Sequence, residues 1–171
     1  MEHCSCLTED GVCVTDQVLQ TVVERQLPVG AALGAPPPEA YQLAPPAIKE
    51  MLERAGVTFE QVRATRLQTV GLMHRVGVRF VAGRDCGINP WLAHGMMWAA
   101  AAFYVEAGAS TAEAAAAATS HAADACGIAD HTGRLRPGYD ADILIVRGDL
   151  QADITRPANV QAVLLEGERV K

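Results

Sequence analysis

The residues of this chain with the clearest capacity for chemistry are an aspartate and a cysteine enclosed by glycines. Asp85 and Cys86 belong to the segment "GVRFVAGRDCG", residues 77–87, and follow an apolar run typical of a buried strand. A carboxylate in such a place can hold a cation or move a proton. Gly83 and Gly87 let the backbone approach a ligand closely and adopt unusual dihedral angles. Two interpretations stay open from these residues: Asp85 serves a site at the strand end, or it caps the next helix.

The amino terminus is a second candidate, because His3 stands beside several cysteines. Cys4, Cys6 and Cys13 could form a zinc site with it, but C-x-C and one later cysteine lack the paired C-x-x-C spacing of structural zinc. The chain has five cysteines, an odd number without framework spacing, which favours reduced thiols over disulfides. We therefore expect reduced cysteines in a cytoplasmic protein, with Cys4, Cys6 and Cys13 as small buried thiols.

Two further histidines are expected to have structural roles. His74 stands on a predicted helix in the basic group that runs from Arg63 to Arg79, and we expect this group to form a solvated helix face. His121 lies in an alanine-rich segment, which favours packing over metal ligation.

Composition limits the class of protein. The 171 residues are enough for one domain, or for one domain and a small appendage. Half of them are hydrophobic and only 5% are aromatic, so the core must be built from Ala, Val and Leu. The net charge of −6 argues against a nucleic-acid partner and against an anionic membrane surface. The sequence also has no secretory signal pattern and no run of roughly 18 apolar residues, as a spanning helix requires.

Strands and helices are expected to alternate along most of the chain. Buried strands are predicted at Leu27–Leu33 and Val78–Ala82, and the proline-rich segment 34–46 is predicted to be a loop without regular structure. Helices are predicted over 16–26, 47–55, 58–76, 94–107 and 111–126, with Thr15 and Ser110 or Thr111 as amino-terminal caps. This order is typical of a parallel sheet or a (β/α) barrel, in which ligands bind outside the carboxyl ends of the strands.

The chain changes character after about residue 127. A β-rich run at 142–146 and a predicted hairpin within 160–171 indicate a small all-β appendage. Asp140 and Asp142 form a close pair of carboxylates, but their glycine-rich surroundings favour turn and strand-edge roles over catalysis.

Several segments, in order, resemble the C-terminal part of metal-dependent amidohydrolases of the imidazolonepropionase-like and Xaa-Pro-dipeptidase-like branch. They include "FVAGRDCG", "HG" at 94–95, "TGRLRPGYDADILIV" and "VLLEGERV". The element G-x-L-x-P-G-x-x-A-D, residues 133–142, is the most specific of them. The opening "EHC", residues 2–4, resembles the family's sixth-strand motif, and one predicted strand lies between it and the strand before Asp85.

The resemblance implies an α/β fold that is only part of the family's architecture. Residues 1–130 would form the C-terminal part of a TIM-like (β/α)₈ barrel, strands six to eight with their helices. Residues 131–171 would form the remnant of a composite β-sandwich domain. A complete barrel needs roughly 250 residues, and the family's first-strand H-x-H pair, fourth-strand bridging residue and fifth-strand histidine have no counterpart here. The resemblance thus predicts a fragment or truncated homologue.

The family hydrolyses amide and other C–N bonds with one or two divalent metals, of which zinc is the expected one here. By position, Asp85 resembles the eighth-strand aspartate that binds metal and shuttles a proton, and His3 resembles the sixth-strand histidine ligand. His94 lies in a segment that borders the substrate pocket in relatives, so it either contacts substrate or caps a helix. Arg84 stands where the family commonly has a threonine, and it would favour the ionised carboxylate or bind it in an ion pair.

The resemblance leaves three functional hypotheses open. The first is a hydrolase fragment for a small amide or dipeptide-like substrate, with weak or absent metal binding alone, because a catalytic zinc usually takes three protein ligands. In the second, the chain is a non-catalytic module that completes a barrel with a separate amino-terminal half, or forms a homo-oligomer, because open strand edges favour association. The third is an α/β domain without chemistry.

The identity of the metal stays open from the sequence, because zinc, manganese and iron all suit a histidine and a carboxylate.

Overall fold

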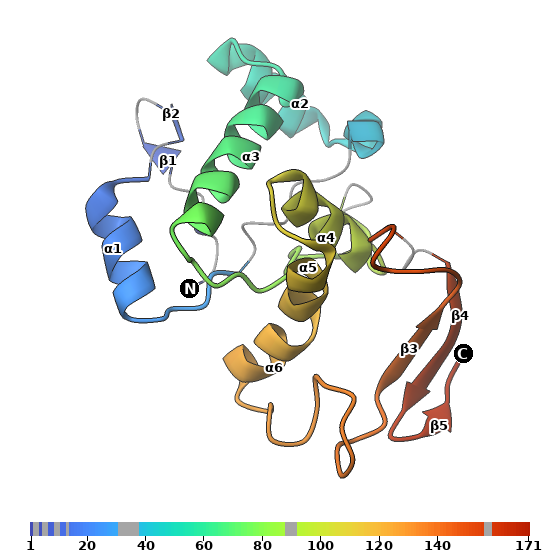
Figure 1. Cartoon of the computed structure of the whole chain (residues 1–171). Helices are drawn as coiled ribbons and strands as arrows, with labels where there is room; N and C mark the ends of the chain where they lie inside the picture. Colours follow the sequence, from blue (N-terminus) through green and yellow to red (C-terminus); the bar gives the residue numbers. More distant parts are fainter. Residues whose placement is uncertain are drawn as a thin grey trace.

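The computed structural model of the chain describes residues 1, 4, 7–8, 11–12, 14–30, 38–87, 92–155 and 159–171. Helices surround a few extended segments, and a small sheet lies to one side of them (Figure 1). The helices are α1 (Asp16–Glu24), the 3₁₀ helix η1 (Pro38–Leu43), α2 (Pro46–Ala55), α3 (Phe59–Arg75), α4 (Met97–Glu106), α5 (Thr111–Ala118) and α6 (Ser120–Cys126). The strands are β1 (Leu7–Thr8), β2 (Gly11–Val12), β3 (Ile143–Val146), β4 (Val160–Leu165) and β5 (Glu168–Arg169).

Two predictions about these elements were wrong. The proline-rich segment 34–46 contains the 3₁₀ helix η1, because its prolines are clustered at the two ends and leave "EAYQL" able to turn. The single helix predicted over 111–126 is divided at Thr119, whose φ of −131° and ψ of −90° are not helical. No helix among the described residues is both long enough and apolar enough to cross a membrane.

The predicted strands around Val29 and Phe80 lie side by side and run in parallel. The Val29 N–H donates to the Arg79 carbonyl, and the Val81 N–H donates to the Val29 carbonyl, both at 2.9 Å. This is the slanted pattern of a parallel pair. The regular pairing is one bridge, which is shorter than the predicted strands, and residues 31–33 of the first strand lie outside the described residues.

The amino terminus lies on the other side of Val29. The Met1 amino group donates to the Pro28 carbonyl at 2.6 Å, and the Gly30 N–H donates to the Met1 carbonyl at 2.8 Å. These two bonds repeat the parallel pattern, now centred on Met1 and Val29. Three parallel segments thus stand next to one another in the order in which they occur in the sequence.

The extended segment 78–84 alternates between a buried and a more open side. Val78, Phe80 and Ala82 are 4%, 1% and 7% exposed, whereas the residues between them are only partly buried. The buried side packs on helices α1, α3 and α4 and forms the hydrophobic core. A period of two is what an extended strand requires, so the segment keeps strand geometry beyond its single bridge.

The helix starts follow local rules that the sequence indicates. The Thr15 hydroxyl accepts from the Val18 N–H at the start of α1, and Ser110 forms a reciprocal capping box with Glu113 at the start of α5, as predicted. At the end of α2, Gly56 has a φ of 65°, the left-handed conformation that commonly ends a helix.

The carboxyl-terminal sheet is antiparallel, with strand order β3-β4-β5. Ile143 pairs with Leu164, and Leu165 pairs with Glu168 across a two-residue turn. The turn residues Glu166 and Gly167 both have positive φ, 50° and 85°, as a type I′ hairpin requires. The predicted all-β appendage and its hairpin are therefore present.

Candidate active site

Asp85 lies just past the parallel segment that contains Phe80, and its side chain is exposed. Its φ is 51°, the left-handed region that few residues other than glycine adopt and that aspartate tolerates better than most. Arg84, directly before it, is buried and only 2% exposed, so the two neighbouring charged groups occupy very different surroundings. The suggested ion pair between them stays a prediction.

Asp85 does not cap helix α4. Helix α4 begins only at Met97, and its N-cap residue is Met96, which makes no side-chain capping bond. The same observation excludes His94 as the cap. Both residues precede α4 in the chain, and residues 88–91 between them lie outside the described residues.

His94 is brought back to the loop that contains Asp85. The Gly87 N–H donates to the Leu92 carbonyl at 2.7 Å, which closes the loop. The exposed His94 ring lies so close to Gly87 that a Cβ at this position would collide with it, and Gly87 has a φ of 98°. The φ of 98° favours glycine at position 87, whereas the exposed His94 ring could move aside for a Cβ.

His3, the second predicted metal ligand, lies outside the described residues, as do Cys6 and Cys13. Among the residues that are described, no group of three His, Cys, Asp or Glu side chains is arranged to hold a metal ion. Of the three cysteines expected to be small buried thiols, Cys4 is described and is partly buried. Cys86 is also partly buried, and Cys126 is exposed.

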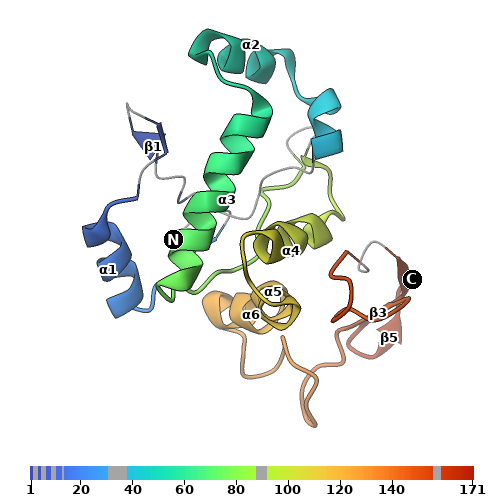
Figure 2. The same cartoon turned by 45° about the horizontal axis from the view of Figure 1, so that its top comes forward.

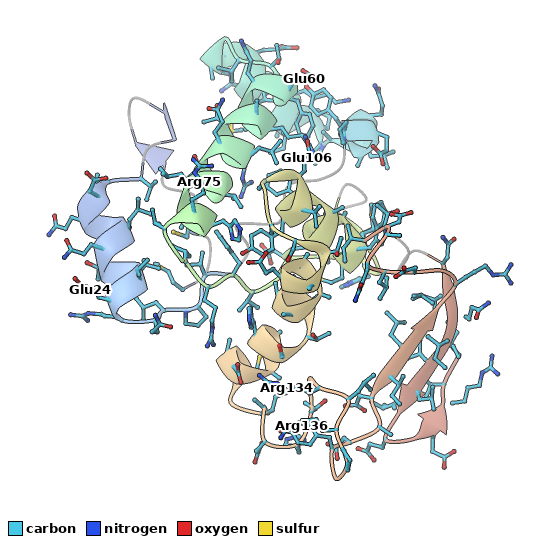
Figure 3. The ribbon with its side chains drawn as sticks, in the orientation of Figure 1. Glu24, Glu60, Arg75, Glu106, Arg134 and Arg136 are labelled. Atoms are coloured by element: carbon cyan, nitrogen blue, oxygen red, sulfur yellow. The ribbon has the colours of Figure 1, made fainter. Side chains whose placement is uncertain are left out.

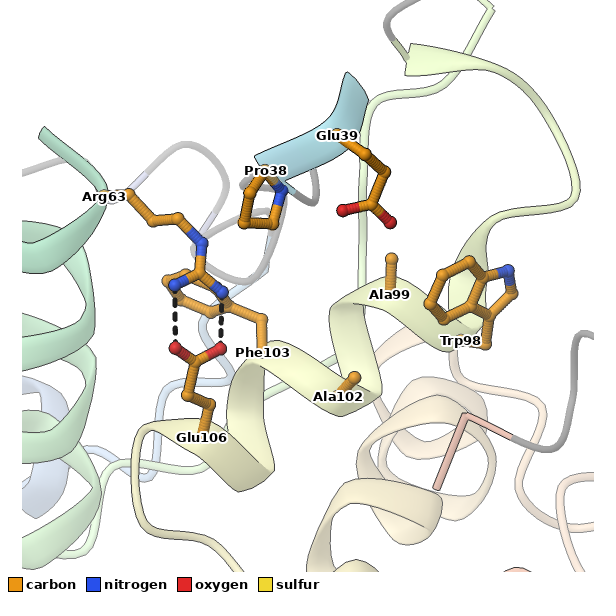
Figure 4. Close-up of a pocket in the computed structure, with 8 residues that line it drawn as sticks. All are labelled: Pro38, Glu39, Arg63, Trp98, Ala99, Ala102, Phe103 and Glu106. Atoms are coloured by element: carbon orange, nitrogen blue, oxygen red, sulfur yellow. Dashed lines mark hydrogen bonds and ion pairs between the residues drawn. The ribbon is translucent and has the colours of Figure 1, made fainter. Parts of the chain in front are cut away.

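A cavity of about 200 Å³ lies between η1, α3 and α4 (Figure 4). Arg63 forms two hydrogen bonds with Glu106 there, and its guanidinium stands 5.4 Å from the centre of the Phe103 ring. The hydrogen bond to Glu106 raises the pKa of Arg63, and the same bond lowers the pKa of Glu106. Arg63 is thus held in an ion pair. The prediction that it belongs to a solvated helix face was wrong. The residues that line this cavity do not include Asp85 or His94.

His74 also differs from the prediction of a solvated side chain. Its Nδ1 lies 2.9 Å from the Tyr104 hydroxyl, and its Nε2 lies 3.9 Å from a Glu113 carboxylate oxygen. Burial raises the pKa of Tyr104 to about 12, so its hydroxyl stays protonated and is a poor nucleophile. The cluster links α3, α4 and α5. The sequence offers no signal for it, because the partners come from separate helices.

The carboxylates of the 133–142 motif have structural partners. Asp142 accepts from the Thr132 hydroxyl at 3.1 Å and from the Glu166 N–H at 3.0 Å, so it ties the motif to the hairpin turn. Asp140 lies 2.7 Å from His131 Nδ1 and raises the pKa of that imidazole. These contacts agree with the predicted turn and strand-edge roles.

Comparison with known proteins places these features in a family. The chain resembles the solved structures of a Xaa-Pro dipeptidase with bound methionine (TM-score 0.75, 20% identity, 99% of this chain and 39% of that one) and of A. niger ochratoxinase (0.69, 23%, 99% and 36%). It also resembles the structure of molinate hydrolase (0.69, 19%, 92% and 35%). The chain thus spans between 35% and 39% of the length of these three proteins.

No curated protein sequence matches the chain significantly. The sequence model of the amidohydrolase family, in contrast, matches residues 7–170, which is nearly the whole chain. With this match and the shared fold, the chain belongs to the amidohydrolase family.

Proposed function

We propose that this chain is the C-terminal part of a metal-dependent amidohydrolase that hydrolyses a C–N bond, with Asp85 as metal ligand and proton shuttle. The observation that carries the proposal is the position of Asp85, exposed and in a left-handed conformation just past a parallel segment. In parallel α/β folds the active site lies at this end of the strands. Unusual backbone conformations also cluster at functional sites.

The proposal includes an assignment of the parallel segments to a barrel. Met1, Val29 and Phe80 would lie on strands six, seven and eight, and residues 1–130 would form the partial barrel. Residues 131–171 would form the remnant of the β-sandwich. The assignment is supported by the parallel hydrogen bonds and by α1, α2 and α3, which lie between successive segments in the chain.

The donor types fit a divalent metal, with zinc as the first choice. The Asp85 carboxylate would be one ligand and the His3 imidazole another, a combination that suits zinc, manganese or iron. A divalent ion bound there would lower the pKa of a water molecule coordinated to it. Asp85 would accept the proton from that water and deliver it to the leaving nitrogen of a small amide or dipeptide-like substrate. His94, whose ring lies close to Gly87, would contact the substrate.

Two ligands from this chain are fewer than a catalytic zinc usually takes. The proposal therefore requires further ligands from outside the described residues, and it predicts weak metal binding and no hydrolysis by the 171-residue chain alone. Stoichiometric zinc binding together with metal-dependent amide hydrolysis by this chain would contradict that part of the proposal.

The test of the site uses Mn²⁺ as a paramagnetic probe of weak binding, read by NMR on the chain itself. As Mn²⁺ is added, we expect the amide signals of Asp85 and its neighbour Cys86 to broaden at lower concentrations than those of the other aspartates and glutamates. Asp85→Asn should remove this broadening, whereas the matched control Asp130→Asn, at an exposed turn, should leave it unchanged. Broadening that persists in Asp85→Asn would falsify the assignment of Asp85 as a ligand.

Association is the second candidate function, and one observation favours it. Several large apolar side chains of the small sheet are exposed, Leu144 at 51% and Leu165 at 56% among them. A second chain, either an amino-terminal barrel half or another copy, would cover such groups. Size-exclusion chromatography of the chain at several concentrations tests for the homo-oligomer, and a constant monomer mass would contradict it.

A further inference from the structure

The break between α5 and α6 contacts the segment that leads to Asp85. In an uninterrupted α-helix the Ala117 carbonyl would accept from the N–H of His121. The break at Thr119 releases this carbonyl, which instead accepts from the Ala82 N–H at 2.9 Å. A backbone group of the helix thus bonds directly to the extended segment, three residues before Asp85.

The break leaves the neighbouring carbonyls with partners. The Thr119 hydroxyl donates to the Ala115 carbonyl at 2.8 Å, and the Thr119 N–H donates to the Ala116 carbonyl at 3.1 Å. With Ala82 on the Ala117 carbonyl, three successive acceptors at the end of α5 are satisfied. These three carbonyls at the end of α5 are therefore hydrogen-bonded, unlike those of a frayed helix end.

His121 makes a second contact with the same edge of the segment. Its Nδ1 lies 3.2 Å from the Phe80 carbonyl, and its side chain is partly buried. A carbonyl only accepts, so Nδ1 must be the donor. The Phe80 carbonyl and the Ala82 N–H point away from the edge that pairs with Val29, because peptide groups alternate in direction along a strand. The segment is thus held on one edge by a parallel neighbour and on the other by the helix break.

The 133–142 motif packs against this break. A Cβ added at Gly133 would lie 2.5 Å from the Ala123 Cβ and 3.2 Å from the Thr119 carbonyl, and Gly133 has a φ of 82°. Arg134, next to α6 in Figure 3, lies 3.5 Å from Asp124, which itself lies 4.0 Å from Arg79 on the extended segment. The most specific motif of the chain therefore contacts the element that holds the segment before Asp85.

We infer that the α5–α6 break sets the position of the Asp85 segment, with His121 as a positioning residue that acts through the Phe80 carbonyl. The contacts are those of this chain as it stands. In the closed barrel of the proposed function, the same edge of strand eight would pair with strand one.

The test measures hydrogen exchange of single amides by NMR in the intact chain. His121→Phe keeps a ring but removes the hydrogen bond to the Phe80 carbonyl. Loss of one typical hydrogen bond should weaken the whole contact between this edge and the helix break, so we expect the Ala82 amide to exchange about tenfold faster. The Val81 amide, which faces Val29, should change far less. His121→Asn, which has an N–H near the position of Nδ1, should restore the wild-type rate at Ala82 and the wild-type chemical shift of the Asp85 amide. Cys126→Ala, an exposed site on the same helix, is the control.

Equal acceleration at Val81 and Ala82 would overturn the inference, because it indicates a global loss of stability. Failure of His121→Asn to restore either signal would do the same. If His121→Phe does not fold, the ¹⁵N spectrum of the wild-type imidazole decides. A protonated Nδ1 is expected, and an unprotonated Nδ1 contradicts the contact. The Mn²⁺ experiment tests Asp85 as a metal ligand and is independent of this one. If Asp85 does not bind Mn²⁺, the predicted difference in exchange between Ala82 and Val81 is unaffected.

Discussion

The helical part of the molecule and its carboxyl-terminal sheet contain similar apolar strands but bury them very differently. In the helical part, Val29 and Phe80 are 0% and 1% exposed, because α1, α3 and α4 cover them. In the sheet, Leu144 is 51% exposed and Ile145 is 44% exposed, and the sheet stands beside the helices in both views (Figures 1 and 2). Hydrophobic residues show which surface gains from burial, but the availability of a covering element decides whether it is buried.

The two parts also differ in how their strand edges are satisfied. The segment 78–82 is bonded to Val29 on one edge and to the α5–α6 break on the other. The sheet instead relies on antiparallel neighbours and on a tight turn tied down by Asp142. The first arrangement needs partners distant in sequence, whereas the second is built almost entirely within one hairpin and its neighbour.

The largest effect is expected in the covered core. Met73 is 1% exposed in the cluster that includes Phe80, so Met73→Ala should lower the free energy of unfolding by about 2–5 kcal/mol. Urea unfolding followed by circular dichroism measures this loss. A loss below about 1 kcal/mol would mean that the core is loosely packed, and the contrast with the sheet would then disappear.

A smaller loss of unfolding free energy is expected at the start of α5, the helix that ends at the break. Ser110 accepts from the Glu113 N–H and donates to its carboxylate, so Ser110→Ala should cost about 1 kcal/mol of unfolding free energy. Ser110→Asp should retain most of the stability, because aspartate is also a good N-cap. Equal losses for the two variants in thermal unfolding would contradict the capping role.

A pH-dependent effect is expected at the Arg63–Glu106 pair. The pKa of Glu106 is lowered in the folded state by its hydrogen bond with Arg63, so the pair stabilises the fold above the ordinary pKa of the carboxyl, 4.5. This contribution should disappear as the pH falls through the lowered pKa. Because Glu106 is about half exposed, the advantage over Glu106→Gln should stay within about 1 kcal/mol. Urea unfolding across this range measures it, and a constant difference down to about pH 2 would contradict the ion pair.

The smallest effect is expected on the open sheet. Leu144→Thr keeps a residue that favours strands and removes apolar surface that is already half exposed, so unfolding free energy should change by less than about 0.5 kcal/mol. The same substitution should reduce self-association if the exposed face is a contact surface, which sedimentation velocity would detect. A loss as large as that of Met73→Ala would show that the sheet is more buried than the structure indicates.

The unusual backbone around Asp85 could be predicted from the sequence, whereas the contacts that hold the segment before it could not, for a definite physical reason. The glycines around Asp85 indicated an unusual backbone, and the structure has a left-handed Asp85 and a positive φ at Gly87 that favours glycine. The role of His121 was predicted only as packing, because nothing near it in the sequence reveals that Phe80 is its partner. The break at Thr119 could not be predicted either, because the alanines on both sides of it favour one continuous helix.

Local features could be predicted from the residues alone: the caps at Thr15 and Ser110, a hairpin around residues 166–168, and the ordered motifs that indicate the family. Each of these depends on residues a few positions apart, whose geometry is set by covalent connection and backbone sterics. The alternation of strands and helices predicted a parallel arrangement, but the register of Met1, Val29 and Phe80 and the helix break beside the segment before Asp85 became visible in the folded chain. Such contacts join segments far apart in the chain, and their register follows from the packing of the whole core.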